Sequence, residues 1–155
     1  MRVFLACALV LGLALPAQGE PKRAWTFDDN PEAPTLDYGT PDSDEIMIIF
    51  SCDPDAKRMT IVESIAAKDL KPGGKATFKL TAGGQSLDLS GDAIANESDG
   101  TVSIEVNGPP NPKLFALLKA GPSMTIEVAG TSESVPLAGA AAHVANFEKL
   151  CFAKK

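Results

Sequence analysis

Cys52 is a residue whose type and setting could do chemistry. It lies two residues after the apolar run of residues 46–50 and is followed by Asp53 and Asp55. A reactive thiol needs an electropositive setting that stabilises the thiolate, and two neighbouring carboxylates oppose that form. Cys52 also shares an alternating face with Ile48 and Phe50, where a buried disulfide belongs. Both interpretations stay open on this stretch alone, and the structural bridge is favoured.

The first residues predict a secretory signal peptide over residues 1–19. Arg2 precedes an apolar run over residues 3–15, Pro16 breaks it, and Ala17 and Gly19 place small residues before a cleavage point. The run is shorter than the about 20 residues that cross a bilayer, and it is typical of a signal sequence. We expect cleavage after Gly19, a periplasmic or secreted location, and no integral membrane segment in the mature chain.

The cysteine count then predicts one disulfide. The sequence holds three cysteines, and Cys7 falls in the predicted signal peptide. An even pair remains in a compartment that oxidises thiols. We therefore expect Cys52 and Cys151 to be joined.

The other candidates for chemistry are few. His143 is the only histidine, no G-x-S-x-G nucleophile elbow is present, and a zinc ligand set cannot be assembled from one histidine and two paired cysteines. We predict no metal site, no cofactor, no catalytic residue and no enzyme activity. The 20 Asp and Glu residues leave two alternatives open, a hydrolase with paired carboxylates and a calcium-dependent envelope protein.

Charge argues against polyanionic partners. The formal net charge is −6, and no run of Lys and Arg is longer than two residues. A nucleic-acid-binding surface needs a basic patch or stripe, so nucleic acid is excluded as an expected partner.

Residues 20–45 form a predicted acidic, proline-rich arm that packs on the body of the protein. Prolines oppose both helix and central strand, so only short edge strands are expected here. Trp25, Phe27 and Tyr38 lie in these short segments. They are the natural contact residues of a binding surface. Alternatively, they pack the arm onto the body.

Residues 46–155 are predicted to form a single β-rich domain. Apolar and polar residues alternate over residues 46–52, 59–65, 75–80, 87–89, 102–106 and 124–128, with turn signals between them. A helix is expected from Asn111 as N-cap and Pro112 as first residue, and a second helix at the C-terminus carries Cys151. The pattern predicts a mainly β fold, an antiparallel β-sandwich or flattened barrel of about eight strands with one inserted and one C-terminal helix.

Two segments carry a resemblance to known proteins, "LDYGTPDSDEIMIIFSC" and "VPLAGAAAHVANFEKLC". With the signal peptide, they make the chain similar to a family of small secreted proteins of Gram-negative bacteria, a domain of unknown function. The C-terminal segment resembles small periplasmic proteins linked to type VI secretion or invasion. The resemblance implies a periplasmic setting and transfers no site residue.

These observations together predict a non-enzymatic periplasmic or secreted binding or accessory module. Its partner would be an envelope protein, recognised through a sheet edge, a groove beside a helix, or the acidic arm.

Overall fold

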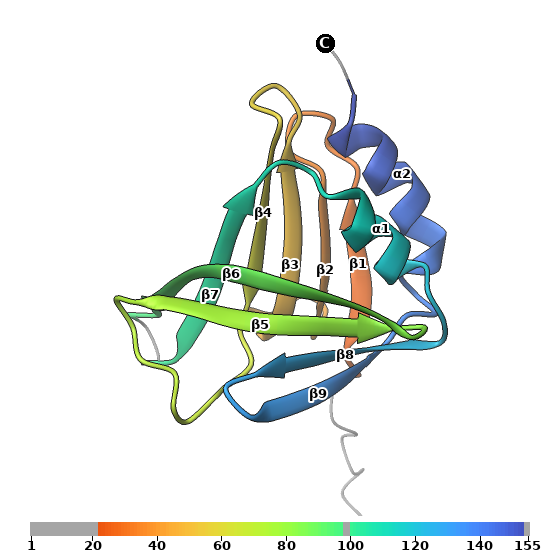
Figure 1. The fold of residues 1–155 in the computed structure, drawn as a ribbon. Helices are drawn as coiled ribbons and strands as arrows, with labels where there is room; N and C mark the ends of the chain where they lie inside the picture. Colours follow the sequence, from red (N-terminus) through yellow and green to blue (C-terminus); the bar gives the residue numbers. More distant parts are fainter. Residues whose placement is uncertain (1–21, 98–99, 154–155) are drawn as a thin grey trace, which may run out of the picture.

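The fold is one curled antiparallel sheet with two helices (Figure 1). The computed structural model describes residues 22–97 and 100–153, so the predicted signal peptide lies outside the described residues. The nine strands follow the order β1-β2-β3-β4-β7-β6-β5-β8-β9. The strands are β1 (Ala24–Asp28), β2 (Thr35–Gly39), β3 (Ile46–Asp53), β4 (Arg58–Glu63), β5 (Lys75–Ala82), β6 (Gln85–Ala95), β7 (Val102–Gly108), β8 (Ser123–Val128) and β9 (Thr131–Pro136), and the helices are α1 (Pro112–Leu118) and α2 (Ala141–Cys151).

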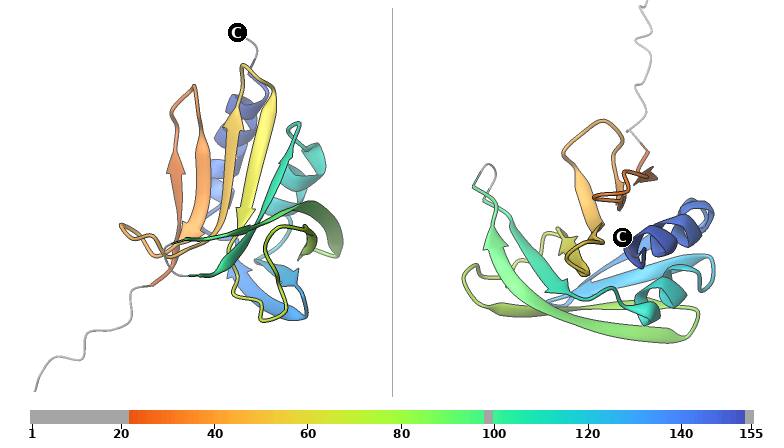
Figure 2. Two further views of the ribbon diagram at one scale, coloured as in Figure 1. Left: turned by 90° about the vertical axis from the view of Figure 1, so that its left-hand side faces the viewer. Right: turned by 90° about the horizontal axis from the view of Figure 1, so that it is seen from above.

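The sequence-based prediction of a mainly β fold with one inserted and one C-terminal helix is confirmed. The predicted count of about eight strands and the predicted β-sandwich are wrong, and the alternative of a flattened barrel is approached only in part, because nine strands form one sheet, a half-barrel that stays open between β1 and β9. In Figure 1, β1 to β4 stand upright while β5, β6, β8 and β9 run across them. Seen from above in Figure 2, the sheet curls around the interior, and both helices lie on its open side.

The sheet bends within β6, where the first part of the strand has one partner and the last part another. Its first part pairs with β5 and its last part with β7, so that Asp92 lies opposite both Lys75 and Glu105. A Cβ at the preceding Gly91 would lie 2.0 Å from the carbonyl oxygen of Glu105. Only glycine allows β7 to approach this closely, and such a glycine is typical of the corner of a barrel.

The predicted arm supplies two regular strands of the same sheet. β1 pairs with β2 with Trp25 opposite Tyr38, and β2 pairs with β3 with Tyr38 opposite Ile48. The pairing shifts at Gly39, which lies opposite Ile46, so Met47 is a bulged residue. Both Met47 and Ile48 are therefore buried on the inner side.

The helices are fixed by a cap and a covalent bond. As predicted, Asn111 is the N-cap of α1, and its side chain accepts a hydrogen bond from the backbone N–H of Lys113 at 3.0 Å. The predicted disulfide is confirmed, since Cys52 in β3 is bonded to Cys151 at the end of α2 with their Cα atoms 5.4 Å apart. α2 is thereby tied to a strand of the first half of the sheet.

The two edge strands meet at one point. Nε1 of Trp25 in β1 donates a hydrogen bond of 2.6 Å to the carbonyl oxygen of Pro136 in β9. The contact spans 111 positions of the chain and holds the half-barrel nearly closed on this side. Of the helices that the structure describes, none combines the length and the apolar character needed to cross a bilayer.

Candidate functional site

The three aromatic residues of the predicted binding surface take part in packing. Trp25 and Tyr38 are buried, with ring centroids 5.3 Å apart, and Trp25 stacks on Phe50 at 6.3 Å. Phe27 is half-buried and stacks on the ring of His143 at 5.3 Å. The structure thus gives these rings the packing role that the sequence left as the alternative, and their role in partner contact stays a prediction.

The chemistry-bearing residues of the sequence are spread over the molecule. His143 lies in the first turn of α2, and the cysteines are in the disulfide. Within residues 22–97 and 100–153, no three His, Cys, Asp or Glu side chains gather as a metal-binding group. None of these residues forms a site by itself.

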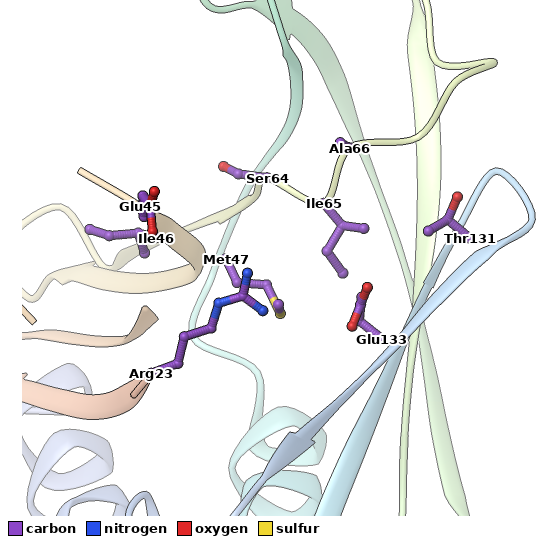
Figure 3. A pocket seen from close by; sticks show the side chains of 9 residues that line it. All are labelled: Arg23, Glu45, Ile46, Met47, Ser64, Ile65, Ala66, Thr131 and Glu133. Atoms are coloured by element: carbon purple, nitrogen blue, oxygen red, sulfur yellow. The ribbon is translucent and has the colours of Figure 1, made fainter. Parts of the chain in front are cut away.

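A cavity of about 350 Å³ lies where the half-barrel fails to close (Figure 3). It is bounded by the start of β1, by the neighbouring ends of β3 and β4, and by the first half of the edge strand β9. Its lining residues are Arg23, Glu45, Ile46, Met47, Ser64, Ile65, Ala66, Thr131 and Glu133. Segments from both ends of the sheet therefore contribute to one hollow.

The inner surface of this cavity is apolar. Met47 and Ile65 are 9% and 6% exposed, and both belong to the hydrophobic core. Met47 points inward because of the bulge in β3, and Ile65 follows the last residue of β4. Figure 3 shows these two side chains between the opposed sides of the cavity.

The outer part of the cavity carries charges of both signs. Arg23 extends from the start of β1, and Glu133 extends from β9 on the opposite side (Figure 3). Glu133 belongs to the face of β9 that also carries the buried Val135, so its side chain is directed to the inside of the curl. In the described part of the chain, neither Arg23 nor Glu133 forms an ion pair. Glu45 accepts a hydrogen bond from the Thr40 hydroxyl at 3.2 Å.

A fully buried carboxyl group is hydrogen-bonded to a residue of the cavity lining. Glu63 ends β4 on the same inner face as Met59 and Ile61, and it is 0% exposed. Its Oε1 accepts a hydrogen bond from the backbone N–H of Ile65, a residue of the wall. Its Oε2 has no hydrogen-bond partner among the described residues. The carboxyl group is thus held by the backbone of a residue that lines the cavity.

The surroundings of Glu63 change its acidity. Desolvation by burial raises the pKa of this carboxyl from its ordinary value of 4.5 to about 7, although the hydrogen bond from the Ile65 backbone acts in the opposite direction. Near neutral pH the group is therefore close to half protonated.

The sequence contained a signal for Glu63 that the search for motifs did not use. Met59 and Ile61 were assigned to the inner face by their alternation, and position 63 continues that series. A glutamate at an inward position of a strand is exceptional, because carboxylates are almost never fully buried unless paired. The alternation of inward and outward positions along the strand thus identifies Glu63 as an inward-facing acid. Residue type alone does not distinguish it from the other acidic residues.

A second cavity, of about 340 Å³, lies near the start of α1. Met59, Ile61, Leu89 and Val106 line it together with residues 108–112. None of these lining residues is charged, so this cavity has little to orient a ligand. The cavity at the open edge, with its apolar inside and charged outside, is the better candidate.

No protein-family model, curated protein or solved structure matches this chain. Its function must therefore be inferred from the geometry of the site.

Proposed function

We propose that the protein is a non-enzymatic binding module of the periplasm or the extracellular space, and that it takes a small ligand in the cavity between β9 and the ends of β3 and β4. The observation that carries the proposal is the combination, in one hollow, of a buried apolar inside and of outer charges of opposite sign that form no ion pair with the described residues.

This combination is the usual design of a ligand pocket. Such pockets are concave, apolar over most of their surface, and equipped with a few polar groups that fix the orientation of the ligand. They commonly have volumes of about 300–1,000 Å³ and occur at the mouths of β-barrels. At about 350 Å³ the cavity suits a small molecule.

The disulfide supports the proposed location. Disulfides form and persist in oxidising compartments and are rare in the cytosol. The Cys52–Cys151 bond is buried, with both residues 3% exposed, and it joins distant parts of the chain as a structural disulfide does.

The test is a ligand screen with a variant that fills the cavity. We expect Thr131→Trp to abolish the rise in melting temperature that a small-molecule hit produces in the wild type, because the indole would occupy the cavity. Ser132→Trp, one position along β9 on its outer face, is the matched control and should keep the full rise. A hit that stabilises both variants equally would place the ligand elsewhere and refute the proposed site.

A hydrolase is the second candidate, and the raised pKa of Glu63 favours it. A carboxyl group with a pKa of about 7 is suited to act as a general acid. Its complete burial argues against this role, because a catalytic acid must reach the substrate. Turnover of a bound ligand by the wild type and its loss in Glu63→Gln would establish the hydrolase, whereas binding without turnover supports the module.

A further inference from the structure

We propose that the cavity selects a cationic ligand, a small primary ammonium with a short aliphatic body, and that binding of this cation is coupled to ionisation of Glu63. The inference rests on the proposed function, since it names the ligand class of the same cavity.

The first argument is the balance of charge around the cavity. Two carboxylates, Glu45 and Glu133, line the cavity together with one cation, Arg23. Lysine is missing from the lining, and the formal net charge of the chain is −6. A negative potential of this kind attracts cations from solution and raises their local concentration at the site.

The second argument is the unsatisfied oxygen of Glu63. A buried acceptor without a hydrogen-bond partner is costly, and the other oxygen of the same carboxyl group, Oε1, accepts from the backbone N–H of Ile65, which lines the cavity. A cation in the cavity would interact favourably with the ionised form of this carboxyl group, since an opposite charge within about 4–6 Å favours the charged form. The apolar surroundings weaken screening of this interaction by salt.

Glu63 is well isolated from other charges. Its neighbours across the sheet are Ile48 in β3 and Ile104 in β7. The charged residues of β3, β4 and β7 themselves, Asp53, Arg58 and Glu105, alternate with the buried residues of their strands and so belong to the outer face. The charged groups that line the neighbouring cavity are Arg23 before β1, Glu45 before β3 and Glu133 in β9. In the described part of the chain Glu63 forms no ion pair, so the charge of the ligand would be the dominant new influence on its titration.

The apolar inside of the cavity determines which chemical group the ligand carries besides its ammonium group. Met47 and Ile65 offer a thioether and an aliphatic surface. A short alkyl chain would bury apolar area against them while its ammonium group stays near the carboxylates.

Three probes of nearly equal shape separate charge from hydrophobicity. Hexylammonium, hexanol and hexanoate are titrated into the ¹⁵N-labelled mature protein and followed by the backbone amides of residues 64–66 and 131–133. We expect hexylammonium to bind at least about tenfold more tightly than hexanol, and hexanoate more weakly than either. Glu133→Gln should reduce this preference, and Glu127→Gln, on the outer face of β8, should leave it unchanged.

The pH dependence tests the role of Glu63. An alkylammonium stays protonated over the range from about pH 6 to about pH 8, as a lysine side chain does. The affinity for hexylammonium should rise at least about threefold over this range in the wild type and stay flat in Glu63→Gln. Proton release on binding, measured by calorimetry in buffers of different ionisation enthalpy, should disappear in the same variant.

The outcomes separate the two proposals. Equal binding of hexanol and hexylammonium at the cavity amides overturns the cationic ligand class and leaves the binding module standing. Preferential binding of the cation with an unchanged pH profile in Glu63→Gln overturns the coupling to Glu63. Absence of any shift at the cavity amides with all three probes, together with stabilisation of Thr131→Trp by every screening hit, overturns the proposed function itself.

Discussion

Glu63 lowers the stability of the folded protein, because its carboxyl group is buried and only partly hydrogen-bonded. It is fully buried, and one oxygen has no hydrogen-bond partner in the described structure. A leucine or methionine at this position would fill the same space without that cost. A residue that lowers stability next to a cavity is typical of a functional position rather than of a structural one.

The stability of the protein should fall as pH rises because of Glu63. The folded state holds this proton up to about pH 7, whereas the unfolded chain releases it near its ordinary pKa of 4.5. The folded state therefore binds more protons in this window, and the free energy of unfolding decreases by up to about 3 kcal/mol between these two pH values. Above about pH 7 the decrease levels off. Urea unfolding at several pH values measures this change in the free energy of unfolding.

Glu63→Gln should remove this slope, because its side-chain oxygen can still accept from the Ile65 backbone while no charge can form. Glu127→Gln makes the same chemical change on an exposed position and should keep the wild-type slope. A variant Glu63→Gln with the wild-type pH dependence would contradict the assignment.

Single residues were predictable where their type implies a geometry. Asn111 before Pro112 indicated a helix start, and two cysteines in a chain predicted to be exported indicated a disulfide. The structure confirms the helix start and the disulfide. Glu63 was not predicted because the alternation of β4 was used only to place apolar side chains. Its isolation also depends on Ile104 in β7, a neighbour that is distant in sequence and that local patterns do not reveal.

At the scale of elements, α2 depends on its covalent link to β3. Its inner face is short, with Val144, Phe147 and Cys151 buried. Since the disulfide closes a loop of 99 positions, chain-entropy models assign it about 4–5 kcal/mol, and the removal of such bonds commonly costs about 2–5 kcal/mol.

We expect Cys52→Ala combined with Cys151→Ala to lower the free energy of unfolding by about 2–5 kcal/mol. Hydrogen exchange should show the amides of α2 losing protection before those of β3 and β4, because only the helix loses its anchor. Chemical unfolding measures the loss of free energy of unfolding. Hydrogen exchange monitored by mass spectrometry measures the protection of the amides. Unchanged protection of α2 would show that its apolar face holds it without the bond.

The elements themselves followed from sequence patterns, with one informative exception. The alternation predicted in this part of the chain covered residues 87–89 only. In the structure β6 continues to Ala95 by exchanging its partner from β5 to β7. The sequence does not distinguish a glycine that permits a bend from a glycine that ends a strand. The distinction requires knowing that β7 pairs with the second part of β6.

At the scale of the molecule, Gly91 determines the curvature of the sheet. Gly91→Ala should lower the free energy of unfolding by at least about 2 kcal/mol, because the new Cβ meets the backbone of Glu105 in the adjacent strand. Gly108→Ala is the matched control, since its Cβ would have no heavy atom within 4 Å, and it should change stability by less than about 0.5 kcal/mol. Thermal and urea unfolding compare the two. Equal stability of both variants would refute the corner role.

The open half-barrel itself could not be read from the sequence. The sheet is completed by pairing of β4 with β7 and of β5 with β8, and these pairs join segments separated by other strands. Local alternation defines each strand and its inner face, but it does not define the neighbours. The cavity depends on these neighbours, because its walls come from β3, from β9, and from the residues just before β1 and just after β4.

The contact between Trp25 and Pro136 provides an intrinsic fluorescence signal for the closing of the half-barrel. The sequence contains one tryptophan, and its indole lies where the first and the last strand meet. Indole emission depends on burial and hydrogen bonding, so the fluorescence of the unlabelled protein reports whether the two edges are together. The same signal can follow the closing of the sheet during refolding in real time, without a dye and without a change to the sequence.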